Sequence, residues 1–189
     1  AGSGHFLARA RSWGFQVSGI EPAPAAARYG RERLGVRIIA QELDKLDWAG
    51  PLFDVVTAWD VLEHLGDPRR ALTRMVDWLR PGGILAVRFP AAGWQRFKGL
   101  VFHRLLGRDR PAFAPTIHLY FFSRETFGEL ARQVGLQVLL ARTTGIEPNL
   151  DSFYLNGLKL LSQAALRCCE TLVHKPLGNL EVYCRKEAG

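Results

Sequence analysis

Apolar and polar positions along the chain follow two spacings, one typical of strands and the other typical of helices. Short apolar runs predict strands at residues 15–21, 36–40, 53–59, 84–89, 136–142 and 180–186. Apolar residues that recur every three or four positions predict helices at 5–13, 24–34, 67–79, 124–134 and 155–172. This alternation predicts a doubly wound, Rossmann-like α/β fold with a mostly parallel sheet. The last strand is predicted to pair antiparallel with the one before it.

Several of the predicted boundaries carry explicit signals. Asp67 followed by Pro68 is typical of a helix start, because the carboxylate can cap free N–H groups and proline lacks one. Gly14 and Gly35 directly follow the first two helical patterns, where glycine commonly ends a helix. A turn is predicted at 81–83, just before strand 84–89.

Composition fits a globular protein. The chain has 189 residues, of which 48% are hydrophobic and 23% are charged. We predict a single domain over 1–189, with a ligand-binding half at 1–90 and a second half at 91–189. Two irregular stretches near 91–116 and 145–178 are predicted to be insertions.

Charge and cysteine content limit the partners and the compartment. The formal net charge of +7 comes from arginines scattered over many segments, which disfavours nucleic acid as a partner. No apolar run reaches the ~18 residues of a transmembrane helix. The three cysteines, Cys168, Cys169 and Cys184, are predicted to be buried thiols, which favours a cytoplasmic location.

Small and polar residues follow the predicted strands, at the edge where an open α/β sheet binds its ligands. Gly2 and Gly4 lie in the opening loop AGSGHFL, whose backbone can pass close to a ligand. Glu21 ends strand 15–21, where an acid can accept hydrogen bonds from the two hydroxyls of an adenosine ribose. Taken alone, these residues also fit an ordinary loop and a solvent-exposed strand end.

Further residues at the same predicted edge strengthen the hypothesis of a binding site. The next two strand ends are followed by Glu42 and Leu43, and by Trp59, Asp60 and His64. Asp60 has an ordinary alternative, as the N-cap of a short helix that runs through Leu65. Small or polar residues occur in four loops at one edge of the predicted sheet. A shared ligand site explains them better than four separate structural roles.

A dinucleotide-binding fold also has an acidic residue at this strand end that binds the ribose hydroxyls. The dinucleotide-binding alternative therefore needs a separate test. Its G-x-G-x-x-G/A pattern requires a small third residue for close packing of helix and strand. Counted from Gly2, that position is Leu7. The sequence therefore disfavours an NAD(P)-dependent enzyme.

Five segments, taken in order, resemble class I S-adenosylmethionine-dependent methyltransferases, in the small-molecule branch that includes the ubiquinone-biosynthesis O-methyltransferases. They are AGSGHFL, GIEPAP, FDVVTAWDVLEHLGDP, LRPGGILAVRFP and HLYFFSRETFGELARQVGLQV. The resemblance runs from Ala1 to about Val138, and the family's antiparallel last strand suits 180–186. In the family a first strand, an acid and a further glycine precede the opening loop. The chain is therefore expected to be truncated at its N-terminus, with the first strand missing.

The resemblance implies S-adenosyl-L-methionine as the cofactor, no metal ion, and one residue set for the cofactor. Gly2 and Gly4 would pass beneath the methionine portion, and Glu21 would hold the ribose hydroxyls. The adenine would be met by Pro22, Glu42 and Leu43, and the reactive end by Trp59 and Asp60. Relatives often have Asn where this chain has Ala91, a difference on the acceptor side.

A hydroxyl acceptor benefits from a base whose pKa lies near the working pH, which histidine meets. His118 and His64 are the candidate catalytic residues, each with the alternative of a side chain that merely fixes a loop. Arg88 lies inside an apolar strand and needs a partner there. We expect a carboxylate of the fold rather than an anionic acceptor.

The predicted activity is S-adenosylmethionine-dependent methyl transfer to a small-molecule acceptor, with oxygen as the accepting atom. A non-catalytic methyltransferase-like binding or scaffold domain stays open as an alternative, in particular for a truncated chain. Segment 93–110 is basic and partly amphipathic, which permits peripheral contact with an anionic membrane. A lid helix whose apolar face packs on the core is the favoured explanation of that segment. The oligomeric state is left open.

Overall fold

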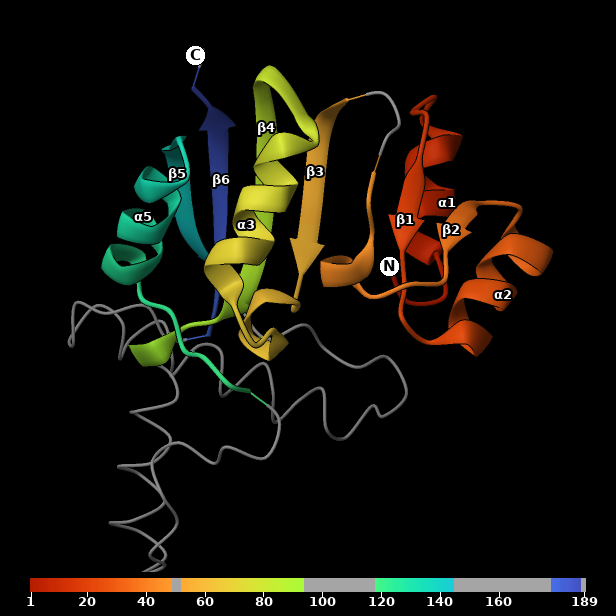
Figure 1. The fold of residues 1–189 in the computed structure, drawn as a ribbon, viewed down its shortest axis with the longest axis horizontal. Coiled ribbons are helices and arrows are strands. Elements are labelled where there is room, and N and C mark those ends of the chain that lie inside the picture. The colour runs from red at the N-terminus through yellow and green to blue at the C-terminus, as the bar shows by residue number, and fades with distance from the viewer. Residues whose placement is uncertain (49–51, 94–117, 145–177, 188–189) are drawn as a thin grey trace, which may run out of the picture. The chain divides into compact units, whose positions relative to one another are not determined.

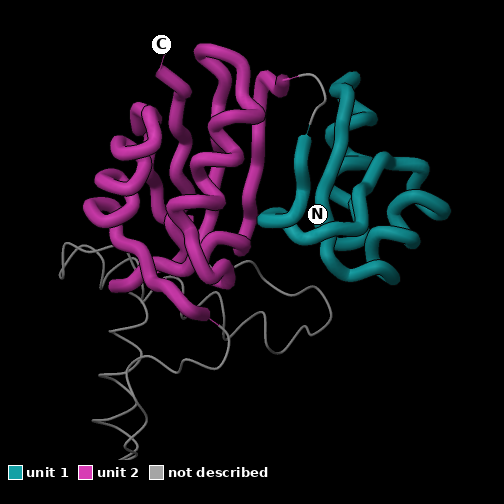
Figure 2. Tube along the Cα trace, in the orientation of Figure 1, with its two compact units in different colours: residues 1–50 teal, residues 51–189 magenta. Residues whose placement is uncertain are grey.

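The computed structural model describes residues 1–48, 52–93, 118–144 and 178–187 (Figure 1). Its elements, in chain order, are α1 (His5–Ser12), β1 (Ser18–Ile20), α2 (Pro24–Leu34), β2 (Arg37–Ile39), η1 (Leu43–Lys45), β3 (Phe53–Trp59), η2 (Leu62–His64), α3 (Pro68–Asp77), β4 (Leu79–Pro90), α5 (Arg124–Gln133), β5 (Leu136–Thr144) and β6 (Asn179–Lys186). They form two compact units, Ala1–Gly50 and Pro51–Gly189, shown in Figure 2. No helix in the described ranges is long and apolar enough to cross a membrane.

The first unit is built on a parallel pair of short strands. β1 pairs with β2 in parallel, with Ile20 opposite Ile39. A small core of Ala27, Val36 and Ile38 is covered by partly buried apolar side chains of α1, α2 and the adjoining loops. Because the strands are parallel, the loops that leave Ile20 and Ile39 emerge at the same edge.

Glycine at position 30 lets α2 pack directly on the opening loop. A Cβ added there would lie 2.9 Å from the carbonyl oxygen of Ser3 and would also meet the side chain of Ile38. A backbone oxygen cannot move aside as a flexible side chain can. The contact therefore fixes the loop that carries Gly2 against the second helix.

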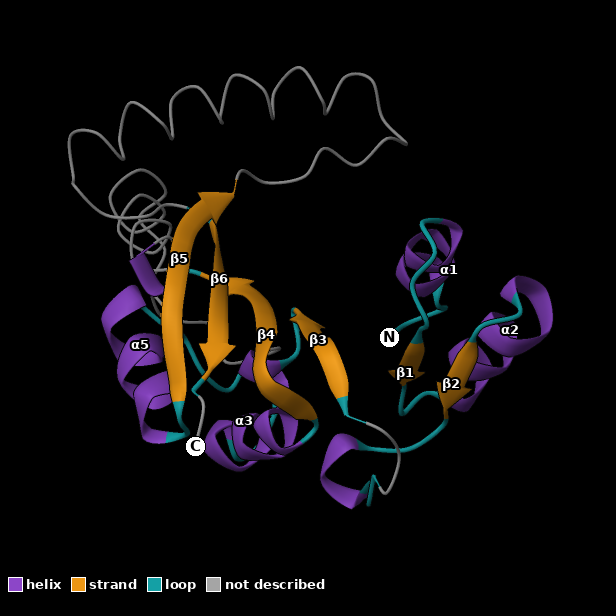
Figure 3. Cartoon of the chain, turned by 90° about the horizontal axis from the view of Figure 1, so that it is seen from above, coloured by secondary structure: helices purple, strands orange, loops and turns teal. Residues whose placement is uncertain are grey.

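The second unit is a four-stranded sheet in the order β3-β4-β6-β5. β3 and β4 are parallel, whereas β6 runs antiparallel to both of its neighbours, β4 and β5. α3 and α5 lie on one face of this sheet (Figures 1 and 3). Three aromatic rings, those of Phe89, Phe122 and Phe127, pack together in the core, with the Phe89 ring centroid 5.0 Å from each of the other two.

The sequence predicted this architecture well. The α/β fold with a mostly parallel sheet and an antiparallel last strand is confirmed, as is the pairing of 136–142 with 180–186. Asp67 caps α3 as expected, accepting a hydrogen bond of 2.9 Å from the Arg70 N–H. Cys184 is buried, as predicted.

Some boundaries differ from the prediction, for physical reasons. Strand 84–89 begins earlier, at Leu79, because Leu79 already pairs with Phe53. The next pair joins Ile84 to Val55, so the predicted turn at 81–83 bulges out of β4 rather than preceding it. Strands 15–21 and 36–40 shorten to β1 and β2, since only three residues of each pair with the other strand.

Several predictions fall outside the described residues. These are the helix at 155–172, the lid or membrane-contact segment at 93–110 beyond residue 93, nearly all of the two insertions, and Cys168 and Cys169. The division into halves at residue 90 stays a prediction.

The packing at Gly30 gives a testable expectation. Gly30→Ala should lower the free energy of unfolding by about 1–3 kcal/mol, as overpacking does, because the new methyl group meets the Ser3 carbonyl oxygen. The control is Gly128→Ala in α5, where an added Cβ meets nothing within 4 Å. That variant should be neutral or gain up to about 1 kcal/mol from helix propensity. Urea unfolding measures the two, and equal effects would contradict the packing argument.

Candidate functional site

The opening glycine loop contains two glycines in different surroundings: Gly4 packs closely against the core, whereas Gly2 has no neighbour where a side chain would lie. Gly2 and Gly4 both have positive φ, +56° and +86°, which favours glycine. A Cβ at Gly4 would lie 2.8 Å from the side chain of Val36, whereas one at Gly2 would meet nothing within 4 Å. Gly4 is therefore needed by the core, and the backbone at Gly2 is open to a ligand.

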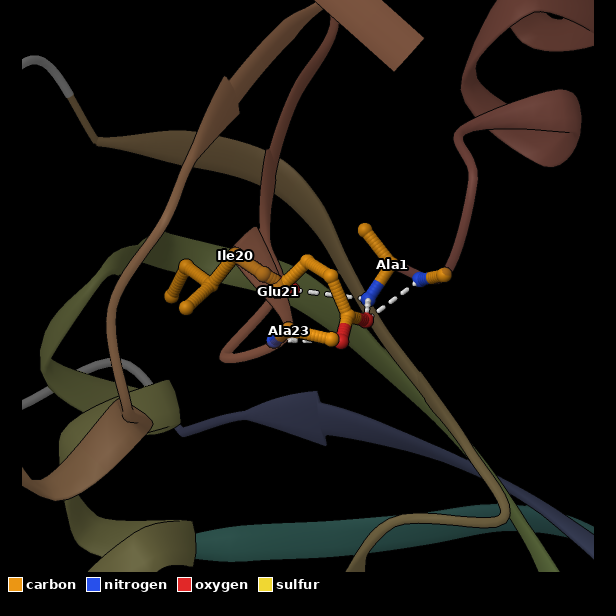
Figure 4. Close-up of polar contacts among 5 residues, drawn as sticks. Ala1, Ile20, Glu21 and Ala23 are labelled. Atoms are coloured by element: carbon orange, nitrogen blue, oxygen red, sulfur yellow. Dashed lines mark hydrogen bonds and ion pairs between the residues drawn. The ribbon is translucent and has the colours of Figure 1, made fainter. Parts of the chain in front are cut away.

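Glu21 ties the end of β1 to this loop (Figure 4). Its Oε2 atom accepts hydrogen bonds from the Gly2 N–H at 2.6 Å and from the Ala1 amino group at 3.2 Å. Its Oε1 atom accepts one from the Ala23 N–H at 3.0 Å. The carboxylate thus holds the loop and the start of α2 together, a structural role that the sequence did not predict.

The same contacts keep Glu21 ionised. Burial alone would raise the pKa of its carboxyl, but hydrogen bonds from the backbone N–H groups of Ala23 and Gly2 hold this pKa below its ordinary value. A carboxylate offers about four acceptor positions, and three N–H donors use part of them. An ionised acid at a strand end therefore fits the hydroxyl donors of a ribose.

The remaining predicted cofactor residues of the first unit follow β2 and β1. The Glu21 N–H donates to the Ile39 carbonyl oxygen at 3.0 Å, so the chain leaves both strands at one edge. Glu42 is exposed and pairs with Lys45 at 3.0 Å, and Leu43 begins η1 half-buried. Pro22 is exposed. Glu42 and Leu43 thus follow β2 at the edge where Glu21 follows β1, and their roles toward a cofactor stay a prediction.

The end of β3 in the second unit is fixed by an ion pair. The Arg88 guanidinium lies 2.6 Å from the Asp60 carboxylate, and the Asp60 N–H donates to the Arg88 carbonyl oxygen at 2.9 Å. The guanidinium also lies 5.9 Å from the centroid of the Trp59 ring. Arg88 therefore pairs with a carboxylate of the fold, as expected. Asp60 adopts a positive φ of 52° and is not a helix N-cap, since Val61 precedes η2.

The two histidines predicted to be catalytic lie side by side. His64 ends η2 and is exposed, His118 is half-buried, and their ring centroids are 4.8 Å apart. The N–H groups of Leu119 and Tyr120 donate to the carbonyl oxygen of Glu63 at 2.7 and 3.2 Å. These backbone bonds hold the segment that follows His118 against η2.

Glu63 is a functional candidate that the sequence analysis missed. Its side chain is 1% exposed, and neither carboxylate oxygen has a hydrogen-bond partner among the described residues. Burial raises the pKa of this carboxyl to about 7, and the nearby charge of Asp60 adds to the effect. The only signal in the sequence is an acid between Leu62 and His64, and nothing in that pattern indicates burial.

Comparison with known proteins now identifies the class. Residues 1–141 match the sequence profile of a methyltransferase domain. This match spans well over half of the chain, and the chain therefore belongs to the methyltransferase domain family. The prediction of a class I S-adenosylmethionine-dependent methyltransferase is confirmed, with S-adenosylmethionine as the cofactor of that class.

Individual relatives resemble parts of the chain. A ubiquinone biosynthesis O-methyltransferase from Azorhizobium caulinodans is 34% identical over 79 residues, which cover 39% of this chain and 31% of that relative. The match thus spans about a third of the relative's length. The N-methyltransferase NodS from Bradyrhizobium japonicum, solved with S-adenosyl-L-homocysteine, aligns with a TM-score of 0.59 and 16% identity over 97% of this chain and 73% of NodS. The [4+2]-cyclase SpnF aligns with a TM-score of 0.65 and 20% identity over 99% of this chain and 72% of SpnF.

The lowered pKa of Glu21 predicts a pH-dependent stability. A carboxyl whose pKa is lower in the folded state stabilises the fold above its unfolded pKa, and this contribution is lost as the pH falls through the folded pKa. Glu21→Gln should therefore lower the thermal midpoint at pH 7, and its difference from the wild type should shrink below about pH 4. Glu42→Gln, at a 57% exposed side chain, should have little effect at any pH. A Glu21→Gln difference that stays constant down to pH 3 would contradict the assignment.

Proposed function

We propose that this protein transfers a methyl group from S-adenosylmethionine to a small-molecule acceptor, with a hydroxyl oxygen as the accepting atom. The observation that carries the proposal is the ionised Glu21 carboxylate at the end of β1, bonded to the glycine loop beside open backbone at Gly2. An acid and a glycine loop in this relation suit an adenosyl cofactor, since the acid takes the ribose and the bare backbone admits the remainder. Membership of the methyltransferase domain family supports the same cofactor.

The roles proposed for the cofactor residues follow from their places in the fold. Gly2 and Gly4 would run beneath the methionine portion and Glu21 would accept from the ribose hydroxyls. Pro22, Glu42 and Leu43, close in the chain to the two strand ends, would border the adenine. Trp59 and Asp60 would line the reactive end, with Asp60 held in place by Arg88.

His64 and His118 are proposed to line the acceptor side. One is exposed and the other half-buried, so both rings are reachable by a small molecule. The O-methyltransferase of ubiquinone biosynthesis, with 34% identity, favours an oxygen acceptor, whereas NodS methylates nitrogen and shares 16% identity. A cytoplasmic location and membrane contact through 93–110 stay predictions of the sequence.

Methyl transfer requires mainly that the acceptor oxygen be aligned with the methyl carbon of the cofactor. When bound, S-adenosylmethionine supplies a methyl carbon already activated by its positive sulfur, and the acceptor hydroxyl gives up its proton as the new C–O bond forms. The residues of the chain have to hold acceptor and cofactor in line, an effect worth roughly 7–11 kcal/mol at best. The backbone bonds between Glu63 and the segment after His118 supply rigidity on the acceptor side.

A second candidate function is a different reaction, or ligand binding without catalysis, on the same fold. SpnF, a [4+2]-cyclase, aligns with this chain over 99% of its length at a TM-score of 0.65. One fold commonly hosts unrelated chemistry. Cofactor binding alone therefore does not establish methyl transfer, and cofactor binding and methyl transfer need separate measurements.

The test of the cofactor site is calorimetry on the full-length protein with S-adenosylhomocysteine. We expect saturable binding to the wild type and at least tenfold weaker binding to Glu21→Ala and Glu21→Gln, because both remove the acceptor charge. Glu32→Ala, on the exposed side of α2, is the matched control and should bind like the wild type. Circular dichroism checks that each variant is folded.

No binding to the wild type, or equal binding by the folded Glu21 variants, would overturn the proposed cofactor site. Transfer of a labelled methyl group from S-adenosylmethionine to a panel of phenols and catechols then separates the enzyme from a binding domain. Labelled product supports methyl transfer to oxygen, whereas cofactor binding without product from any of these hydroxyl acceptors counts against it.

A further inference from the structure

Arg88 is a charged residue near the end of β4, and its side chain is only 20% exposed. Its neighbours in the strand, Val87 and Phe89, are buried in the core. Phe89 packs on Phe127 of α5, and successive residues of a strand point to opposite faces, so Arg88 lies on the face of the sheet away from α5. A largely buried guanidinium is costly unless partners hold it. The position of Arg88 therefore depends on the groups that it binds.

Arg88 belongs to a row of side chains that crosses the four strands of the sheet. It is paired with Trp59 of β3 on one side and with Glu181 of β6 on the other, and Glu181 is paired with Arg142 of β5. Residues directly opposite one another on neighbouring strands lie on the same face. Arg142 and Glu181 form an ion pair of 2.8 Å. Positive and negative groups thus alternate along the row, and Asp60 comes directly after Trp59 at one end of it.

Arg88 contacts Asp60 through both its side chain and its main chain. The guanidinium lies 2.6 Å from the Asp60 carboxylate, and the Arg88 carbonyl oxygen accepts from the Asp60 N–H at 2.9 Å. The guanidinium also lies 5.9 Å from the centroid of the Trp59 ring. Two contacts on one residue fix both the position of its backbone and the direction of its side chain.

Asp60 has a backbone conformation that needs such contacts. Its φ of 52° lies in the left-handed region, and within the described ranges it is the only residue other than glycine with a positive φ. This region is unfavourable for residues with a Cβ atom, although aspartate and asparagine tolerate it better than most. Residues in such conformations are common at functional sites, where surrounding contacts maintain them. The two contacts with Arg88 therefore stabilise a turn that is intrinsically unfavourable.

We propose that Arg88 is a positioning residue for methyl transfer, a role that rests on the proposed function. Arg88 holds Asp60 in the left-handed conformation and so directs the chain out of β3, with Trp59 and Asp60 at the reactive end of the cofactor. It acts through Asp60 and does not itself touch the cofactor. Its guanidinium is 20% exposed and bound to a carboxylate, whereas that carboxylate is 41% exposed and within reach of a ligand.

Calorimetry on the full-length protein with S-adenosylhomocysteine tests this role by a double-mutant cycle. Arg88→Met and Asp60→Ala should each weaken binding by about tenfold, and the double variant should bind no more weakly than the weaker single variant, because both changes remove the same contact. Asp60→Asn should bind at least about fivefold more tightly than Asp60→Ala, since asparagine tolerates the left-handed conformation and can accept from a guanidinium. An ion pair that only stabilises the fold would leave binding unchanged at temperatures where every variant is folded.

Arg80→Met is the matched control. Arg80 and Asp54 also join β4 to β3 by an ion pair, at 2.7 Å, but this pair lies at the start of β3 and both of its side chains are exposed. Its removal should leave the binding of S-adenosylhomocysteine unchanged. Arg88→Lys keeps the charge and replaces Arg88→Met if that variant folds poorly. It should still bind more weakly than the wild type, because an ammonium group lacks the planar fork of a guanidinium.

Hydrogen exchange on the ligand-free protein gives a second readout that needs no cofactor. The peptide that contains residues 60–64 should exchange about tenfold faster in Arg88→Met than in the wild type, because the Asp60 N–H loses the contacts that protect it. Exchange of this peptide should be unchanged in Arg80→Met. Equal exchange in folded Arg88→Met and the wild type would overturn the proposal.

The binding results separate this proposal from the proposed function. Binding to the wild type and equally to folded Arg88→Met, or additive losses in the double variant, would overturn the role of Arg88 and leave the proposed function standing. No binding to the wild type would refute the proposed function, and the role of Arg88 in methyl transfer with it.

Discussion

Parallel pairing of strands is the constraint on which the candidate site depends. β1 lies beside β2 and β3 beside β4, and each pair runs in one direction. Parallel neighbours deliver their carboxyl ends to the same edge, and the chain must leave the sheet there through loops. Those loops have backbone groups that the sheet no longer satisfies. In this protein the Glu21 carboxylate accepts from the Gly2 N–H of the glycine loop, and at the end of β3 the Asp60 N–H donates to the Arg88 carbonyl oxygen.

Burial and hydrogen bonding shift the carboxyl pKa values of Glu21 and Glu63 in opposite directions. Burial raises the pKa of each, but Glu21 accepts from backbone N–H groups that outweigh it, so this pKa falls. Burial of Glu63 outweighs the opposing effect of its own backbone N–H, and its pKa rises to about 7. Glu63 is the more deeply buried of the two, and the balance between burial and hydrogen-bond donors decides the direction of each pKa shift. Glu21 therefore stays ionised with acceptor positions to spare, whereas the Glu63 carboxylate accepts no hydrogen bond from another described residue.

The sequence could predict whatever depends on local pattern. Periodicity located the described helices and strands, and Asp67 with Pro68 marked the start of α3 because capping involves only nearby residues. The position of Glu21 at a strand end followed from the same pattern. The extent of β1 and β2 did not, because strand length depends on the partner available, and only three residues of each find one.

The sequence could not predict the cluster of Glu63, His64 and His118, because it depends on contacts between distant segments. His64 and His118 were each proposed from residue type, yet their adjacency results from N–H groups of Leu119 and Tyr120 that bond to Glu63. No periodicity encodes that contact. The Glu63 side chain is 1% exposed, and one of its carboxylate oxygens lies within 4.8 Å of a ring nitrogen of each histidine. Such a backbone contact joins segments more than fifty residues apart, and a local sequence pattern carries no information about it.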